Sequence, residues 1–141
     1  MLRLKVVCLL KVDDRFLFAI RTNSKSQRQF FVPPGGRIEL FEYSWVAVER
    51  EMREEVGVEL RNPKLLGVLE NMFEWREQKW HEVIFVYLDD RVAPIEIPAM
   101  GIETNGEAFP LVWKSMSELI QADLPIFPDG LLDLLVEKRV C

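Results

Sequence analysis

Residues Gly36–Val58 read GRIELFEYSWVAVEREMREEVGV, and this stretch decides how the chain folds. Its second half predicts a helix from Ser44 to Val56, with Ser44 as the N-cap and Gly57 as the residue just past the helix end. Apolar residues recur in this helix at spacings of three and four, and we expect the stripe that they form to face the core. The stripe consists of Trp45, Val48, Met52 and Val56.

Three carboxylates share another face of this helix. At about 100° per residue, Glu51, Glu54 and Glu55 fall within an arc of roughly 100°, on the same face as the small side chain of Ala47. Neighbouring like charges on a helix repel by about 0.2–0.5 kcal/mol, and a divalent cation would reverse the sign of that cost. Mg²⁺ and Mn²⁺ prefer oxygen ligands, and Arg50, one turn before Glu54, can hold a carboxylate in place. The alternative is a charged helix face that is merely solvated.

The flanks of the helix give the pattern its specificity. The segment resembles the Nudix box, G-x5-E-x7-R-E-U-x-E-E-x-G-U, where U is a bulky apolar residue. At typical residue usage, seven fixed matches arise by chance about once in 10⁸ placements. One departure is Phe41, which stands where relatives often have glycine. The fixed positions are filled by Gly36, Glu42, Arg50, Glu51, Glu54, Glu55 and Gly57.

The resemblance implies an α/β fold, namely an α/β/α sandwich around a mixed β-sheet in which the box forms a loop–helix–loop. It implies that residues 1–141 form a single Nudix hydrolase domain. It also implies a hydrolase that uses Mg²⁺ or Mn²⁺ to cleave the pyrophosphate bond of a nucleoside triphosphate, or of a nucleoside diphosphate linked to another moiety. Bound cations polarise phosphoryl oxygens and template in-line attack by water.

The resemblance also assigns roles by motif position. The catalytic set would be Glu51, Glu54 and Glu55 together with Arg50, which orients them. The same three glutamates would bind the metal, with the backbone carbonyl of Gly35 as a further ligand. The structural positions of the motif would be Gly36, Glu42 as the partner of Arg50, and Gly57 at the end of the helix.

Two alternatives stay open beside the hydrolase. The first is a non-catalytic nucleotide-binding sensor domain of the same fold, against which the intact set of three glutamates weighs. The second is an isomerase of the same general fold that acts on an isoprenoid diphosphate, for which the short chain gives little support.

Composition limits the partners of the chain. It has 141 residues and a net charge of −5, so the basic footprint of a protein that binds a nucleic acid polymer is absent. No apolar run is long enough to span a membrane. Two cysteines and one histidine exclude the common zinc ligand sets and suit a reducing, cytoplasmic setting. We therefore expect a small-molecule nucleotide substrate, and a homodimer is compatible with the sequence although no interface is marked.

Strands and helices are predicted around the box from periodicity and turn residues. The segments 4–12 and 16–20 predict a hairpin, and 65–75 with 79–89 predict a second one whose later strand is interior. A short strand at 30–32 ends at Pro33-Pro34-Gly35-Gly36, which we expect to interrupt the sheet. A long loop is predicted at 91–108, and the C-terminal part reads as a strand at 110–113 and helices at 115–122 and 129–138.

Outside the box, five residues are candidates for substrate contact. Phe73 and Trp75 offer rings for base stacking, and Arg21 offers a cation for phosphate. Glu82 shares an apolar strand face, so we expect it to be partly buried and either liganded or paired. His81 adjoins it and is the weakest candidate. The acids Glu103 and Glu107 belong to the predicted long loop, which could close over the site and supply a base.

Overall fold

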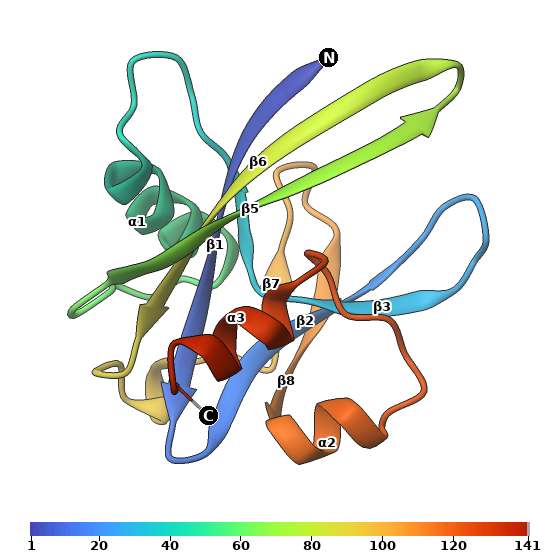
Figure 1. Ribbon diagram of the computed structural model, residues 1–141. Helices are drawn as coiled ribbons and strands as arrows, with labels where there is room; N and C mark the ends of the chain where they lie inside the picture. Colours follow the sequence, from blue (N-terminus) through green and yellow to red (C-terminus); the bar gives the residue numbers. More distant parts are fainter. Residues whose placement is uncertain (141) are drawn as a thin grey trace.

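The computed structural model, which describes residues 1–140, is built around the long first strand (Figure 1). Eight strands form one mixed sheet in the order β5-β6-β1-β2-β8-β7, with β3 beside β2 and β4 beside β1. The strands are β1 (Leu2–Val12), β2 (Arg15–Thr22), β3 (Gln29–Val32), β4 (Gly35–Arg37), β5 (Lys64–Trp75), β6 (Gln78–Asp89), β7 (Met100–Ile102) and β8 (Ala108–Ser115). The helices are α1 (Ser44–Glu55), α2 (Met116–Gln121) and α3 (Leu131–Glu137), with a 3-10 turn, η1, at Pro94–Glu96.

Strand β1 joins the two halves of the sheet. Along one edge it pairs in parallel with β6, from Leu2 opposite His81 to Leu10 opposite Asp89. Along the other edge it pairs with β4 near its middle and with β2 at its end, both antiparallel. The sheet is therefore mixed, as the Nudix resemblance implies.

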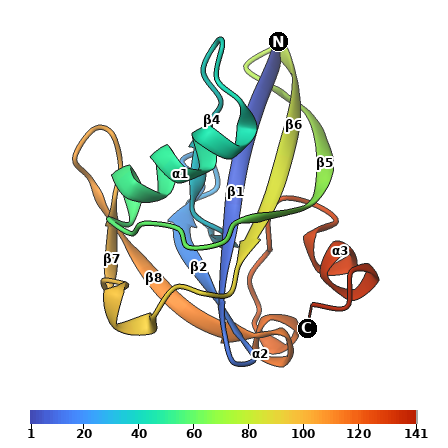
Figure 2. The same ribbon diagram turned by 90° about the vertical axis from the view of Figure 1, so that its left-hand side faces the viewer.

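Helices cover both faces of this sheet (Figure 2). On one face, Ala47, Val48 and Met52 of α1 pack with alternate residues of β1. On the other face, Leu119 of α2 and three leucines of α3 pack with the intervening residues of β1 and with β2. The two apolar layers give the expected α/β/α sandwich, and none of the helices described is both long and apolar enough to cross a membrane.

Both predicted hairpins are confirmed. The turn between β1 and β2 contains Asp13 in the left-handed conformation, and the turn between β5 and β6 contains Arg76 and Glu77 in the same conformation. Strand β6 lies between β5 and β1, so it is the interior strand that its two apolar faces predict.

Two expectations about the connections are wrong. The segment 91–108 is not one long loop, because it contains η1 and strand β7, which pairs with β8. The short strand does end before Pro33, as predicted, but Gly35 and Gly36 return to a ladder, because they begin β4 and pair with Val7 and Val6 of β1. Because glycine lacks a side chain, the backbone of β4 can approach the backbone of β1. The proline pair alone would end a strand.

The predicted orientation of the box helix is partly wrong. Trp45 is 54% exposed, whereas Ala47, placed in the sequence on the carboxylate face, is fully buried. The helix is therefore turned so that the small Ala47 lies against the sheet and the large ring of Trp45 stacks on Tyr43, with ring centroids 6.1 Å apart. Ser44 is also not the N-cap: Tyr43 takes that position, and the Ser44 hydroxyl hydrogen-bonds the Tyr87 hydroxyl at 2.6 Å.

Trp45→Ala is expected to change the free energy of unfolding by less than about 1 kcal/mol, because the ring is largely solvated. The matched substitution Met52→Ala, on the buried side of the same helix, is expected to cost about 2–5 kcal/mol. Urea unfolding of both variants checks this difference. Equal losses would show that the helix buries the tryptophan face.

Candidate active site

Two glycines bring the box helix down onto the sheet. A Cβ on Gly35 would lie 2.0 Å from the carbonyl oxygen of Val6, so only glycine fits where β4 meets β1. A Cβ on Gly36 would lie 2.3 Å from the carboxyl carbon of Glu51. The carboxylate of Glu51 therefore occupies the space that a side chain at position 36 would fill.

Arg50 ties three carboxylates of the box together. Its Nε and Nη2 donate to the two carboxylate oxygens of Glu42 at 2.8 and 2.9 Å. Its Nη1 donates to Glu51 at 2.8 Å and to Glu54 at 3.2 Å, and Nη2 also donates to the carbonyl of Arg37 at 2.9 Å. Such forked, charge-assisted bonds fix the direction of both partners. The loop before the helix is thus locked to the helix itself.

Hydrogen bonding to Arg50 holds the pKa of Glu42 at about 2, below its ordinary value of 4.5. A carboxyl with a depressed pKa stabilises the fold above the pKa of the unfolded chain and loses that stabilisation as the pH falls toward the folded pKa. We therefore expect the parent to be more stable than Glu42→Gln at pH 7, with the gap closing between about pH 5 and pH 2. Urea unfolding across this pH range measures the gap, and a gap that is independent of pH would rule out the ion pair as its source.

Glu55 and Glu51 are the two box carboxylates whose pKa is raised by burial. Burial is the main cause that raises the pKa of Glu55 to about 7, and the charge of Glu51 adds to it. Burial also raises the pKa of Glu51, against the opposing hydrogen bond from Arg50. The backbone N–H of Gly35 donates to Glu55 at 3.4 Å, a long contact. Two acids therefore share a partly buried place beside the glycines, while the side chain of Glu54 is 58% exposed.

The donor set fits a hard divalent cation in its chemistry. Only oxygen ligands are offered, from carboxylates whose mutual repulsion a cation would relieve. The side chains are not gathered around one point, since residues 1–140 hold no group of three or more His, Cys, Asp or Glu arranged to bind a metal. In the structure Arg50 lies between Glu51 and Glu54 and donates a hydrogen bond to each.

Two adjoining cavities open beside these carboxylates. The inner cavity, about 190 Å³, is lined by Lys5, Arg21, Gly35 and Glu55 among others. The outer cavity, about 530 Å³, is lined by aromatic residues (Phe30, Phe73 and Phe127) and by polar residues that include Arg3, Glu82 and Asp129. The two share Lys5, Val7, Phe30 and Val32 in their linings, so they lie side by side.

A family model described as NUDIX domain matches residues 1–135 of the chain. The chain belongs to the Nudix hydrolase family. A curated relative, the uncharacterized Nudix hydrolase YvcI of Bacillus subtilis (strain 168), is 29% identical over 135 residues, which are 94% of this chain and 78% of that protein.

Solved Nudix structures share the fold. The MutT NUDIX hydrolase of Burkholderia pseudomallei superposes with a TM-score of 0.72 at 22% identity, covering 95% of this chain and 96% of that one. The NUDIX domain of Shewanella oneidensis NrtR, solved in complex with ADP ribose, superposes with a TM-score of 0.65 at 18% identity, covering 100% of this chain and 90% of that one.

Arg21 reaches this Nudix site from β2. It lines the inner cavity and its charge opposes the rise in the pKa of Glu55. Its guanidinium pairs with Glu103 from the turn between β7 and β8 and lies 4.4 Å from the centroid of the Phe109 ring. Glu103 is therefore brought to the edge of the cavity through Arg21, whereas the backbone N–H of Glu107 serves the turn itself by donating to Asn105.

The other residues predicted to contact substrate do not all lie on the same face of the sheet. Glu82 and Phe73 line the outer cavity. The side chain of His81, the next residue to Glu82 on the strand, points to the opposite face, where its Nε2 lies 2.7 Å from Glu70. Trp75 lies at the tip of the β5–β6 hairpin under Arg76 and lines neither cavity.

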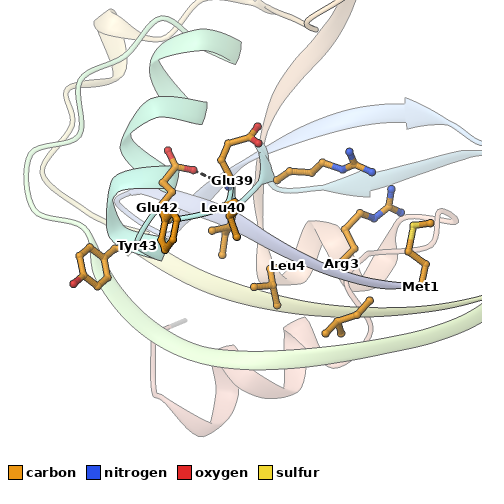
Figure 3. Close-up of a pocket in the computed structure, with 11 residues that line it drawn as sticks. Met1, Arg3, Leu4, Glu39, Leu40, Glu42 and Tyr43 are labelled. Carbon is orange, nitrogen blue, oxygen red and sulfur yellow. Dashed lines mark hydrogen bonds between the residues drawn. The ribbon is translucent and has the colours of Figure 1, made fainter.

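Sequence reasoning missed a third hollow of the molecule. It measures about 660 Å³ and lies between the start of β1 and the box loop 37–43, with Leu4, Leu40 and Tyr43 among its lining residues (Figure 3). Glu39 and Glu42 are in its lining, whereas Glu51 and Glu55 are not, so the hollow lies apart from the proposed metal ligands. Phe41 in this loop is fully exposed and has a φ of 62°, a left-handed conformation that glycine adopts more readily.

Phe41→Gly is expected to leave the protein at least as stable as the parent, because relief of about 1–2 kcal/mol of left-handed strain offsets the added flexibility of the unfolded chain. Phe41→Ala keeps the strained backbone and is expected to be about 1 kcal/mol less stable than Phe41→Gly. Thermal unfolding of the two variants provides the comparison. An alanine variant as stable as the glycine variant would exclude strain at this position.

Proposed function

We propose that this chain is a hydrolase, dependent on Mg²⁺ or Mn²⁺, that cleaves the pyrophosphate bond of a nucleoside triphosphate or of a nucleoside diphosphate linked to another moiety. The observation that carries the proposal is the position of Glu55, coupled to the neighbouring Glu51, in the lining of a cavity that adjoins an aromatic one. The residues that would hold the cation are Glu51, Glu54, Glu55 and the carbonyl of Gly35. When bound, the cation would polarise the phosphoryl oxygens and lower the pKa of a water.

Two basic side chains would contact the phosphates of the substrate. Lys5 and Arg21 line the inner cavity beside Glu55, where they would neutralise the charge that builds on the phosphoryl oxygens. Arg50 acts as a positioning residue, because its bonds to Glu42 and Glu51 hold the carboxylate of Glu51 over Gly36.

The nucleoside would occupy the outer cavity. Phe30 and Phe127 pack edge to face, with ring centroids 5.2 Å apart, and form one wall with Phe73 as a further lining ring. Stacking on such rings is worth about 1–3 kcal/mol per base. Aromatic walls beside a charged inner end fit a molecule with a flat apolar part and a phosphate part.

Binding without turnover is the second candidate function. The observation that favours it is the position of Arg50, which neutralises Glu51 and Glu54 and keeps them apart from a common centre. The complete set of three glutamates favours hydrolysis, because a binding domain has no need of all of them.

The deciding experiment is product release from a panel of nucleoside triphosphates, nucleotide sugars and dinucleoside polyphosphates, with Mg²⁺, with Mn²⁺ and with chelator. Release of a nucleoside monophosphate that chelator abolishes is the expected result. Tight nucleotide binding with no product from any member of the panel would establish the sensor function instead.

We further propose that residues 1–141 act as a single Nudix domain in the cytoplasm, on small molecules rather than on a nucleic acid polymer or a membrane. The net charge of −5 and the buried thiol of Cys8 support this proposal. A homodimer is compatible with it, and light scattering at two concentrations would measure the mass.

A further inference from the structure

A buried ion pair forms part of the lining of the outer cavity. Glu82 of β6 is 5% exposed and lies opposite Arg3 of β1 in the parallel register. Nε and Nη2 of Arg3 both reach Oε2 of Glu82, at 2.9 and 2.7 Å. The ammonium of Lys5 lies 3.7 Å from the same oxygen. All three residues line the outer cavity, and Lys5 continues into the inner one beside Glu55.

The geometry leaves one oxygen of this carboxylate free. Among residues 1–140, every hydrogen bond and ion pair of Glu82 goes to Oε2, and Oε1 has no partner. Arg3 also contacts an aromatic ring, because its guanidinium lies 4.6 Å from the centroid of the Trp80 ring. Trp80 in turn stacks on Phe73. A carboxylate with one oxygen anchored presents its other oxygen in a fixed direction as a hydrogen-bond acceptor.

We propose that Glu82 is a specificity-determining residue that accepts a hydrogen bond from an exocyclic amino group of the nucleobase. The inference rests on the proposed function, which places the nucleoside in the outer cavity. Cytosine, adenine and guanine carry such an amino group. Uracil offers one N–H between two carbonyl oxygens, which a carboxylate repels, and hypoxanthine lacks the 2-amino group of guanine. The enzyme therefore prefers bases that carry the amino group to matched bases that lack it.

A purely structural role makes a different prediction. A cross-strand ion pair that only joins β1 to β6 would affect stability and would leave base selectivity unchanged. A site that hydrogen-bonds its substrate discriminates strongly against analogues that lack the group, because its buried polar atoms are then left unpaired.

Matched substrate pairs test the proposal. We expect kcat/KM for CTP to exceed that for UTP, and that for GTP to exceed that for ITP, by at least about tenfold. Glu82→Gln keeps the shape of the side chain but can turn its amide to donate or accept, so both ratios are expected to fall to within about threefold of one. Glu70→Gln, on the opposite face of the same sheet, is the matched control and is expected to keep the parental ratios.

Binding provides a readout that needs neither turnover nor metal. In calorimetric titrations with chelator present, the parent is expected to bind CMP at least about tenfold more tightly than UMP, and Glu82→Gln is expected to bind them alike. Melting temperatures establish that both variants fold. A lower melting temperature for Glu82→Gln with parental selectivity would overturn the proposal in favour of the structural role.

The outcomes separate this inference from the proposed function. Turnover of all four triphosphates with no amino preference leaves the hydrolase in place and removes the role of Glu82. Absence of turnover with a Glu82-dependent preference for CMP removes the hydrolase and keeps the role of Glu82.

Discussion

Glu55→Gln is expected to lower kcat at least about a hundredfold, because the lost carboxylate would contribute several kcal/mol of charge stabilisation through the bound cation. The fold is expected to survive. The pKa of Glu55 is raised to about 7 by burial, so its charge destabilises the folded state as the pH rises from about 4.5 through 7. In chelator at pH 8, the variant is therefore expected to melt at or above the temperature of the parent.

The measurement is steady-state hydrolysis of the best substrate from the panel, beside thermal unfolding of the metal-free protein. Glu49→Gln, on the same helix but outside the fixed box positions, is the control and is expected to keep parental kcat. Parental kcat in Glu55→Gln, with the reaction still abolished by chelator, would remove Glu55 from the proposed ligand set.

Gly35→Ala is expected to have the largest effect on stability. The new Cβ would lie 2.0 Å from the carbonyl oxygen of Val6 and 2.7 Å from the Cα of Val7, and both atoms are backbone at the centre of the sheet. Overpacking of this kind costs about 1–3 kcal/mol and more where the neighbours cannot move, so we expect a loss of about 3 kcal/mol or more. At about 2–4 °C per kcal/mol, the melting temperature falls by at least about 6 °C.

Gly36→Ala is the informative comparison, because the three atoms nearest to its Cβ all belong to the carboxylate of Glu51, the end of a flexible side chain. We expect a smaller loss of stability than in Gly35→Ala but a clear loss of kcat, since Glu51 leaves its place. Thermal unfolding and hydrolysis of both variants separate the two effects. A parental melting temperature for Gly35→Ala would show that β4 does not press on β1.

Features that depend on neighbouring residues could be predicted from the sequence. The two hairpins follow from turn residues flanked by apolar strands, and both are present. The end of α1 follows from Gly57, which has a φ of 76°. The contact between Glu42 and Arg50 follows from the family motif, and the structure contains it.

Contacts between distant segments escape such rules. A helical wheel ranks Trp45 as core, yet the close approach of α1 to β1 admits only the smaller Ala47. The pair of Arg21 with Glu103 joins β2 to the turn between β7 and β8, and the pair of Arg3 with Glu82 depends on the parallel register. The periodicity of a single segment predicts neither the strand register nor the strand order.

The parallel pairing of β1 with β6 also determines how late β1 can find its partner while the chain is being synthesised. Arg3 and Glu82 are 79 residues apart, so β1 leaves the ribosome long before its main partner exists. At about 5–20 residues per second, the delay is roughly 4–16 s. During that time the apolar run Val6–Leu10, buried in the finished protein, is exposed to water and to other nascent chains. The strand that organises the sheet is thus a segment that we expect to benefit from chaperone protection during synthesis.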